Sequence, residues 1–388
     1  MKTSKICLDS NRRLSWTKGL AACWAAVAVC CGAAEIDINA SLRKGADFLL
    51  AAQEEDGHWS DGDMPALTAL PVWALSEGGG ALEAPVRTRL VAAVSNGVQF
   101  VLAAQKADGG FYNTRPGRGG GGLGTYNTSV CMSALHLSRL APVGAILKAR
   151  TFLAGSQLTG DDTMAGGFGY DRFDPSRPGR GGRPPRRSAD LSNTSYALSA
   201  MRLTAGVEDL RPAGEPRADL DWSRAIAFVE NLQKKEGEDR GGAAYNARTP
   251  QAGTTTNNQG RVHLRAYGSM SYGAVLSMCS ANLTKSDPRV KMALEYCTKY
   301  WNVDENPGMG SQGLYYYYDI LSRALAAAGV DRLATTDGKV IDWKRELATR
   351  LVALQKADGS WANDNNRFWE ADPVLCTSFA MIALELCR

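Results

Sequence analysis

The fold is decided by a seven-residue stretch near the end of the chain, Gln355-Lys356-Ala357-Asp358-Gly359-Ser360-Trp361. Residues 53–59 and 105–111 repeat its pattern, in which a glutamine, two variable residues, Asp-Gly and one further residue lead to an aromatic ring. An apolar segment with helical periodicity precedes each copy, and a second apolar segment follows beyond a loop. Self-similarity of this kind indicates a repeat protein built from one supersecondary unit.

Looser versions of the unit occupy the rest of the chain, at 151–201, 222–272 and 290–319. Together the copies predict six helix–loop–helix hairpins and no strands. Each hairpin has an apolar face that it cannot bury alone, so neighbouring hairpins must stack. The Asp-Gly pair of each clear copy ends the first helix in a turn. We therefore predict an all-α fold whose hairpins form either an open solenoid or a closed ring.

The composition is that of a folded globular chain. Of the 388 residues, 44% are hydrophobic and 22% are charged, which argues against wholesale disorder. The formal net charge of +4 is too small to indicate a nucleic-acid binder. We expect no nucleic acid among the partners of this protein.

The first 34 residues have the pattern of a secretory signal peptide. A basic start is followed by an apolar run over 20–31 and by Gly32-Ala33-Ala34, small residues of the kind found at a cleavage site. The run is too short to span a bilayer, so we expect no transmembrane anchor. The prediction is a mature domain over 35–388, exported to the periplasm or the extracellular space. Its five scattered cysteines are expected to be buried thiols rather than a disulfide scaffold.

The Gln-x-x-x-Gly-x-Trp pattern resembles the QW repeat of squalene-hopene and oxidosqualene cyclases, which occurs in weaker form in protein prenyltransferase β subunits. The resemblance extends from about Ile38 to Arg388. It implies an α/α toroid of six helical hairpins, an (α/α)6 barrel formed by the single domain 35–388. The outer helices would end at the glutamine motifs, and the inner helices would line a central cavity.

The catalytic groups of that family have no clear counterpart here. Its cyclases protonate their substrate with the middle aspartate of an Asp-x-Asp-Asp motif, and the nearest match is Asp61-Gly62-Asp63-Met64. Asp63 matches the acid although Met64 replaces the next aspartate, and a solvated turn is the plainer interpretation. Prenyltransferases bind zinc through Asp, Cys and His, and none of the three histidines of this chain stands in a matching context. We expect no metal and no other cofactor.

The inner helices carry the remaining candidates. Helical periodicity puts Tyr315, Tyr316 and Asp319 toward the cavity, and Tyr317 and Tyr318 against an outer helix. Aromatic faces stabilise carbocations and also stack on sugars, so they do not decide the substrate. A tyrosine-rich contact between helices is an equal interpretation. The candidate catalytic residues are Asp63, Asp319 and Asp372, and the candidate ligand-binding residues are Tyr267, Tyr272, Tyr315, Tyr316 and Trp369.

Two loops share one arginine- and glycine-rich sequence. Residues 115–120, Arg-Pro-Gly-Arg-Gly-Gly, return unchanged at 177–182. Arginine clusters with flexible glycines suit an anionic partner, and a solvated loop is the alternative. Because both loops join an outer to an inner helix, we expect them on one rim of the ring.

Three functional hypotheses remain open at the level of sequence. The first is a central cavity that binds a small or hydrophobic ligand, with or without cyclase-like chemistry. The second is a non-catalytic interaction module of the cell envelope or the extracellular space. The third is a polysaccharide-active (α/α)6 enzyme, which would need an acid–base pair of carboxylates at the mouth of the cavity. Tyrosines and the carboxylates of Asp63, Asp319, Glu370 and Asp372 could serve, and nothing in the sequence pairs them. Whether the protein is an enzyme stays open.

Overall fold

The helices of the chain fall into two alternating sets. The computed structural model describes residues 36–78, 84–113, 122–176, 187–256 and 259–388. Within these ranges the odd-numbered α-helices are α1 (Ile38–Ala51), α3 (Ala84–Ala103), α5 (Val143–Ala154), α7 (Trp222–Leu232), α9 (Pro288–Lys299) and α11 (Trp343–Leu354). The even-numbered ones are α2 (Pro65–Gly78), α4 (Gly124–Ser138), α6 (Leu191–Leu203), α8 (Gly268–Ser280), α10 (Leu314–Ala327) and α12 (Pro373–Leu386).

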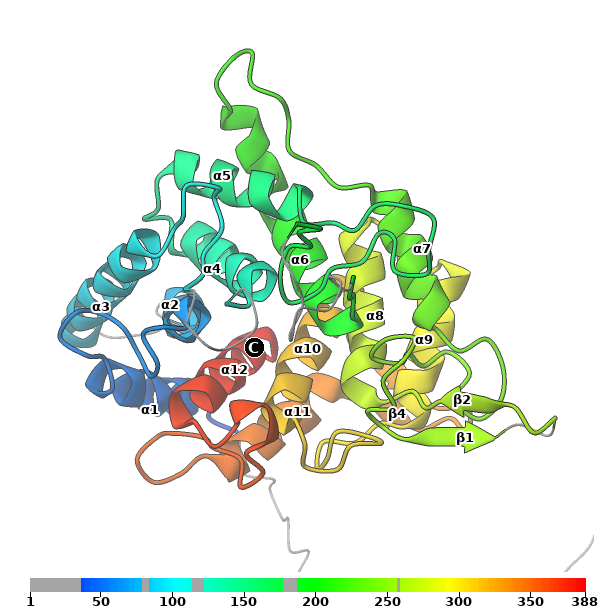
Figure 1. Cartoon of the computed structure of the whole chain (residues 1–388). Coiled ribbons are helices and arrows are strands. Elements are labelled where there is room, and N and C mark those ends of the chain that lie inside the picture. Colours follow the sequence, from blue (N-terminus) through cyan, green and yellow to red (C-terminus); the bar gives the residue numbers. More distant parts are fainter. Residues whose placement is uncertain (1–35, 79–83, 114–121, 177–186, 257–258) are drawn as a thin grey trace, which may run out of the picture. The chain divides into compact units, whose positions relative to one another are not determined.

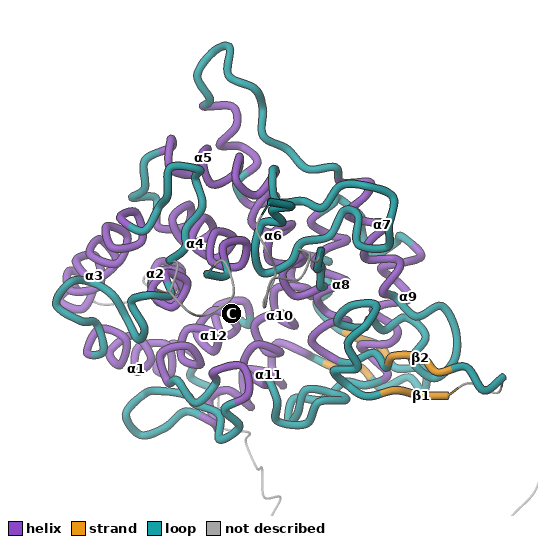
Figure 2. The backbone as a smooth tube through the Cα atoms, in the orientation of Figure 1, coloured by secondary structure: helices purple, strands orange, loops and turns teal. Residues whose placement is uncertain are grey.

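The even-numbered helices form a closed inner ring. Contacts run from α2 to α4, α6, α8, α10 and α12 in turn, and α12 packs back against α2. Figure 1 shows α1, α3, α5 and α7 outside their even-numbered neighbours, and the tube in Figure 2 shows the same arrangement. The expected all-α fold is therefore confirmed, and of the two arrangements left open by the sequence the ring is the one observed.

Burial of side chains explains which helices lie inside. In α2 every residue from Pro65 to Leu75 is buried, as expected for a helix enclosed by neighbours on all sides. The outer helix α1 buries only a stripe, formed by Ser41, Leu42, Gly45, Ala46 and Leu49. An inner helix such as α2 is buried on all sides, whereas an outer helix keeps a polar face for water.

Five glutamines of the repeated motif each link their hairpin to the next one. The Gln53 Nε2 donates to the carbonyl of Gly57 in its own turn at 3.0 Å and to the carbonyl of Ala93 in α3 at 2.9 Å. The same pair of bonds recurs at Gln105, Gln157, Gln233 and Gln355. At Gln355 the second acceptor is the carbonyl of Ser41 in α1, at 2.9 Å. This last bond joins the final hairpin to the first and closes the ring.

Gly359, in the turn that follows Gln355, cannot be replaced by a residue with a side chain without strain. Gly359 has a φ of +88°, a conformation that residues with a side chain adopt at a cost. A Cβ at this position would lie 2.3 Å from the backbone oxygen of Lys44 in α1. The glycine therefore allows the turn to touch the backbone of the neighbouring outer helix.

Two short hairpins interrupt the helical pattern, and the expectation of no strands is wrong in this detail. Strands β1 (Thr254–Thr256) and β2 (Val262–Leu264) pair antiparallel in the long loop before α8. Strands β3 (Leu333–Ala334) and β4 (Val340–Ile341) pair in the same way before α11. These strands of two or three residues are local turns in loops, and they have too few residues to show an alternating pattern in the sequence.

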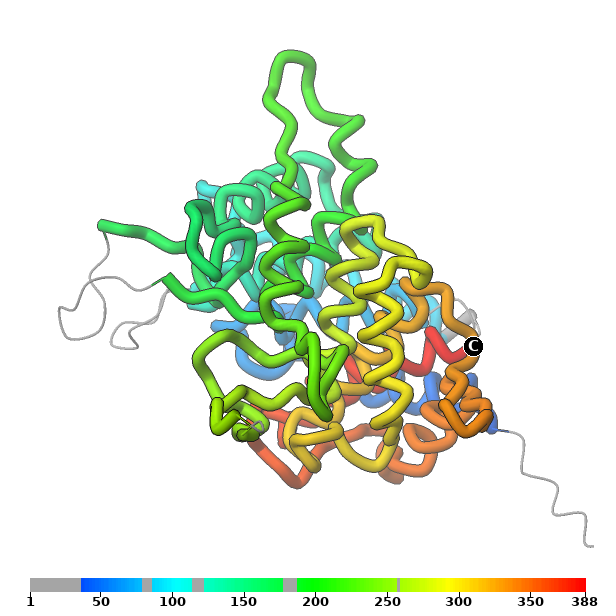
Figure 3. Tube along the Cα trace, turned by 90° about the vertical axis from the view of Figure 1, so that its right-hand side faces the viewer, coloured from blue at the N-terminus to red at the C-terminus, as the bar shows by residue number. Residues whose placement is uncertain are grey.

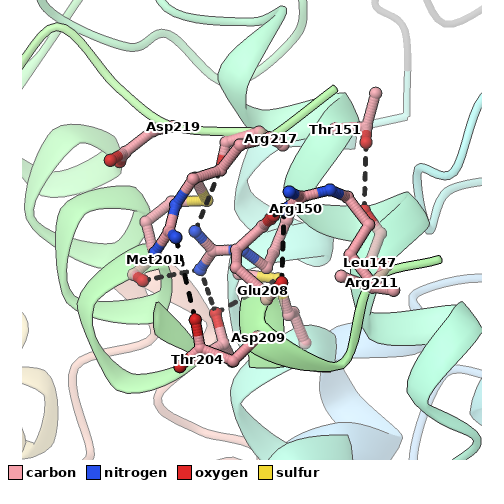
Figure 4. Close-up of polar contacts among 12 residues, drawn as sticks. Leu147, Arg150, Thr151, Met201, Thr204, Glu208, Asp209, Arg211, Arg217 and Asp219 are labelled. Carbon is pink, nitrogen blue, oxygen red and sulfur yellow. Dashed lines mark hydrogen bonds and ion pairs between the residues drawn. The ribbon is translucent and has the colours of Figure 1, made fainter. Parts of the chain in front are cut away.

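A buried ion pair fastens the segment between α6 and α7. This segment includes the 3-10 helix η3 (Ala205–Leu210) and stands out from the ring in Figure 3. The Arg150 Nε donates to Glu208 at 2.7 Å, and the two side chains are 2% and 1% exposed. Figure 4 shows the other bonds of Arg150, to the carbonyl of Met201 and to the hydroxyl of Thr204. The guanidinium of α5 thus holds the end of α6 and the start of the projecting segment together.

Two further expectations can be compared with the described residues. Cys131, Cys297, Cys376 and Cys387 are buried, Cys279 is half-buried, and all five are unpaired thiols. None of the described helices combines the length and the apolar character needed to cross a membrane. The predicted signal peptide, residues 1–34, lies outside the described residues.

Candidate functional site

A central cavity of about 370 Å³ lies between the inner helices and the loops that lead into them. Its lining comes from the first turns of the inner helices and from the outer-to-inner loops. The lining residues are Met64, Ala66, Leu67, Leu123, Tyr126, Tyr170, Ser192, Tyr196, Tyr245, Gln251, Tyr267, Ser269, Met270, Asn306, Met309, Gln312, Gly313, Tyr316, Phe368, Trp369, Glu370, Leu375 and Phe379.

Aromatic rings form a continuous wall of this cavity. Tyr126 of α4 meets Tyr196 of α6 edge to face, with 5.4 Å between ring centres. Tyr196 lies 6.1 Å from Tyr316 of α10, which in turn lies 6.3 Å from Phe379 of α12. Four inner helices therefore contribute to one aromatic surface, at distances typical of favourable ring pairs.

The tyrosine hydroxyls in the wall stay protonated. Burial raises the pKa of Tyr126, Tyr196 and Tyr316 well above the ordinary value for a phenol. The same cause raises the pKa of Tyr267, which lines the cavity from the start of α8. The wall is thus made of neutral rings with negative faces and polar edges.

Among the lining residues, Glu370 is the one with a carboxylate. Its side chain is 1% exposed, and burial raises its pKa to about 7. One oxygen accepts from the backbone N–H of Tyr316 at 2.8 Å, and the other accepts from the Asn363 amide at 2.7 Å. The N-cap residue of α10 is Gly313, which has no side chain to cap the helix. Glu370 supplies that cap from the following hairpin.

A second buried carboxylate stands beside the tyrosines of the lining. Asp190 is the N-cap of α6 and accepts from the backbone and the side-chain amide of Asn193 at 2.9 and 2.8 Å. Burial raises its pKa to about 6, although hydrogen bonds from Asn193 and Tyr245 act in the opposite direction. Asp190 therefore remains largely ionised at neutral pH, next to Tyr245 of the cavity wall.

A buried ion pair of Asp319 and Arg323 lies next to the aromatic wall, inside the ring of inner helices. The Arg323 guanidinium donates to Asp319 at 3.2 Å and to the Ser199 hydroxyl at 2.8 Å. It stacks between the rings of Trp73, at 4.8 Å, and Tyr196, at 5.3 Å. Burial raises the pKa of Asp319, and the charge of Arg323 opposes that shift. The rings of Trp73 and Tyr196 thus enclose the charge of Arg323, and neither Asp319 nor Arg323 belongs to the described lining of the cavity.

The mouth of the cavity carries a strained segment. In the 3-10 helix η4 (Arg367–Trp369), Phe368 and Trp369 both have a φ of +67°, and both side chains are 46% exposed. The Arg367 guanidinium donates to the amide oxygens of Gln312 and Gln251, at 2.7 and 2.8 Å. It also lies 5.1 Å from the centre of the Phe368 ring. These contacts hold two large aromatic side chains in a backbone conformation that costs free energy.

Three of the five tyrosine and tryptophan candidates from the sequence line this cavity, namely Tyr267, Tyr316 and Trp369. Tyr315 and Tyr272 lie outside the lining. Tyr315 packs edge to face on Tyr318 at 5.7 Å, and Tyr272 packs on Tyr317 at 5.8 Å. The reason is the helical period, because one residue step turns a side chain by about 100° and so removes Tyr315 from the face of Tyr316.

The structure does not bring the three aspartate candidates together on the cavity. Asp63 is exposed, and it is the next residue, Met64, that lines the cavity. Asp372 accepts from the backbone of Val374 as the N-cap of α12, and also from the Ser60 hydroxyl. Asp319 is buried in its pair with Arg323. Asp372 and Asp319 thus have structural roles, as a helix cap and as a partner of Arg323.

Sequence reasoning missed four tyrosines of the lining, and it named Glu370 only as one of the carboxylates that could serve a polysaccharide-active enzyme. Tyr170 and Tyr245 end two similar stretches, 166–170 and 241–245, which both read Gly-Gly-x-x-Tyr. That repetition is a signal from which both could have been found. No such signal marks Glu370, because its role depends on a contact between two hairpins. The repeated arginine–glycine segments 115–120 and 177–182 lie outside the described residues.

Comparison with solved structures identifies the fold. The chain is similar to the type II terpene cyclase MstE from Scytonema in complex with geranylgeranyl dihydroxybenzoate, at 13% identity over 90% of this chain and 96% of that one, with a TM-score of 0.50. It is also similar to a GH76 α-mannanase from Bacteroides thetaiotaomicron, at 13% identity, the same coverage and a TM-score of 0.52.

A third similar structure is protein geranylgeranyltransferase-I of Candida albicans complexed with GGPP, at 12% identity over 89% of this chain and 90% of that one, with a TM-score of 0.52. No protein-family model and no curated protein matches the sequence. The expectation of an α/α toroid is confirmed, and at these identities the similarity shows the fold alone.

Proposed function

We propose that this protein binds a small, largely apolar molecule in its central cavity. The observation that carries the proposal is the contiguous aromatic wall formed by Tyr126, Tyr196, Tyr316 and Phe379. A concave site lined mainly by apolar and aromatic groups is the common form of a small-molecule pocket. The molecules bound in two similar structures, geranylgeranyl dihydroxybenzoate and GGPP, both carry long apolar chains and agree with this choice.

The hydrogen bonds within the lining favour an apolar ligand over a carbohydrate. Both Glu370 oxygens accept from protein donors. The Asn306 amide is bonded to the backbone and the hydroxyl of Ser269, at 3.0 and 3.2 Å. The hydroxyls of Ser192 and Tyr316 lie 3.1 Å apart and satisfy each other. A sugar would have to break such bonds in order to form its own, whereas an apolar ligand leaves them intact.

Acid catalysis on the bound molecule is a second candidate, and one observation favours it. The pKa of Glu370 near 7 keeps part of this carboxyl protonated at neutral pH, as a general acid requires. Glu370 accepts a hydrogen bond at the start of α10, which is the role of a helix cap. We therefore prefer ligand binding to acid catalysis as the proposed function. A Glu370→Gln variant that still binds the ligand but no longer converts it to product would support the catalytic role.

Binding can be tested with the fluorescence of Trp369 and with two ligand series. We expect geraniol and farnesol to change the emission of the protein in a saturable way, and mannose oligosaccharides to have no effect. A Trp369→Phe variant identifies the reporter. The Ser192→Phe variant places a ring in the cavity, and it should abolish prenyl-alcohol binding while the circular-dichroism spectrum stays unchanged. Failure of every prenyl alcohol to bind at millimolar concentration would reject the proposal.

We also propose that residues 1–34 direct export of the chain. The basic start and the apolar run over 20–31 support this. Expression in a bacterial host, followed by fractionation and N-terminal sequencing of the exported protein, should give a mature chain that starts near residue 35. Retention of the full chain inside the cell would contradict it.

A further inference from the structure

We propose that the ligand of the central cavity carries a quaternary ammonium group. The inference rests on the proposed function, because it assigns a chemical class to the molecule bound in the same cavity. It goes further by naming the charge of that molecule and the groups that recognise it.

The lining has the composition of a cation site. Its aromatic residues are Tyr126, Tyr170, Tyr196, Tyr245, Tyr267, Tyr316, Phe368, Trp369 and Phe379. The described lining residues include a carboxylate, Glu370, but no lysine, arginine or histidine. Ring faces attract a cation within about 6 Å of their centres, and enclosure from water strengthens this attraction.

Buried negative charge behind the rings acts in the same direction. Asp190 is 2% exposed, and its hydrogen-bond partners, the Asn193 amides and the Tyr245 hydroxyl, are neutral. Its charge is therefore not cancelled by a salt bridge, whereas Asp319 is paired with Arg323. A carboxylate beside the wall lowers the potential in the cavity, where the surrounding protein screens charge less than water does.

Two arginines of the protein already stack on rings of this cavity. The Arg323 guanidinium lies 5.3 Å from the centre of the Tyr196 ring, on the side of the ion pair. At the mouth the Arg367 guanidinium lies over Phe368 and donates to the amide oxygens of Gln312 and Gln251. Rings of the lining thus already serve as partners for cationic groups of the protein.

The choice of a quaternary over a primary ammonium follows from the state of the acceptors. A primary ammonium needs hydrogen-bond acceptors, and at Glu370 it would compete with the N–H groups of Tyr316 and Asn363, which already donate one bond to each oxygen. A quaternary ammonium has no N–H to satisfy and presents methyl groups to the rings. It therefore leaves the hydrogen bonds of Glu370 intact.

The test compares the affinities of two molecules that have the same shape but differ in charge. Phenyltrimethylammonium and tert-butylbenzene differ in having N⁺ or carbon at the branch point, and their dissociation constants can be measured by calorimetry or from Trp369 emission. We expect the cation to bind about tenfold more tightly than the hydrocarbon. Benzylammonium, a primary ammonium of similar size, should bind more weakly than phenyltrimethylammonium.

Variants at Tyr126 separate the ring from its hydroxyl. Tyr126→Phe keeps the ring and should stay within about twofold of the wild-type affinity for phenyltrimethylammonium. Tyr126→Leu should weaken binding of the cation about fivefold, and by more than it weakens binding of tert-butylbenzene. Matching circular-dichroism spectra and melting temperatures establish that both variants fold.

The outcomes distinguish this inference from the proposed function. If tert-butylbenzene and prenyl alcohols bind but the cation binds equally or more weakly, the quaternary ammonium is overturned and the apolar cavity stands. If no prenyl alcohol and neither member of the matched pair binds, both proposals are rejected. If Tyr126→Leu leaves a tenfold preference for phenyltrimethylammonium over tert-butylbenzene unchanged, the cation is not recognised by this aromatic wall and the inference is overturned.

Discussion

Replacing Gly359 by alanine should weaken the ring at the point where the last hairpin meets the first. Two costs add at this position. The φ of +88° costs an alanine about 1–2 kcal/mol. The new Cβ would also lie 2.3 Å from the oxygen and 2.7 Å from the carbon of the Lys44 carbonyl, and backbone atoms cannot rotate away as a flexible side chain can.

Relief of that overlap must move the turn away from α1. The same turn carries the bonds from Gln355 to the carbonyls of Ser41 and Gly359, both 2.9 Å long. Each such bond contributes about 1 kcal/mol. We therefore expect Gly359→Ala to lower the free energy of unfolding by about 3–4 kcal/mol in total.

Gly338→Ala is the matched control. Its φ of +85° is nearly the same, but a Cβ there has no heavy atom within 4 Å. It should show the conformational cost alone, about 1–2 kcal/mol. Urea unfolding of the purified proteins, followed by circular dichroism, measures both changes if the slope of the transition is unchanged. Equal destabilisation by the two variants would refute the tight contact at the closure of the ring.

Three further perturbations test two buried charges and the arginine at the mouth of the cavity. Because burial raises the pKa of Glu370 from 4.5 to about 7, its contribution is fully present below pH 4.5 and is lost as the pH rises through 7. Glu370→Gln should therefore remove up to about 3 kcal/mol of the fall in unfolding free energy between pH 4.5 and 8, measured by urea titration at each pH. Arg150→Met should lower the free energy of unfolding by about 3–5 kcal/mol, because Glu208 stays buried with Arg211 as its remaining ion-pair partner. The double variant Arg150→Met/Glu208→Gln should recover part of that loss in the same assay. Arg367→Gln should accelerate ligand release about tenfold in stopped-flow fluorescence, because it frees the strained Phe368 segment, and an unchanged rate would exclude a clamp at the mouth.

The sequence predicts the helices and their order because those depend on local pattern. The glutamine, the Asp-Gly turn and the apolar segments act within one hairpin, so three clear copies suffice to place the looser ones. The orientation of Tyr316 toward the cavity also follows from helical periodicity. That period is too coarse to assign Tyr315, which lies one residue away and packs on Tyr318 instead.

The candidate site is harder to predict because it is assembled between hairpins. Glu370 matters because its loop meets the first turn of α10, and no pattern around 370 carries that information. The same holds for Arg323, which joins Asp319 of its own helix to Ser199 of α6. Such contacts join residues far apart in the sequence, and a single sequence does not show which distant residues lie close together in the fold.

The bond between Gln355 and Ser41 also has a consequence for how the protein matures. It spans 314 positions of the chain, and α12 occupies the place beside α2 that completes the circle. While the chain is being synthesised, the apolar side of α2 that later receives α12 has no cover. Such an uncovered seam invites misassembly and aggregation until the last helix arrives. Productive folding of this ring must therefore wait until α12 is available to pack against α2.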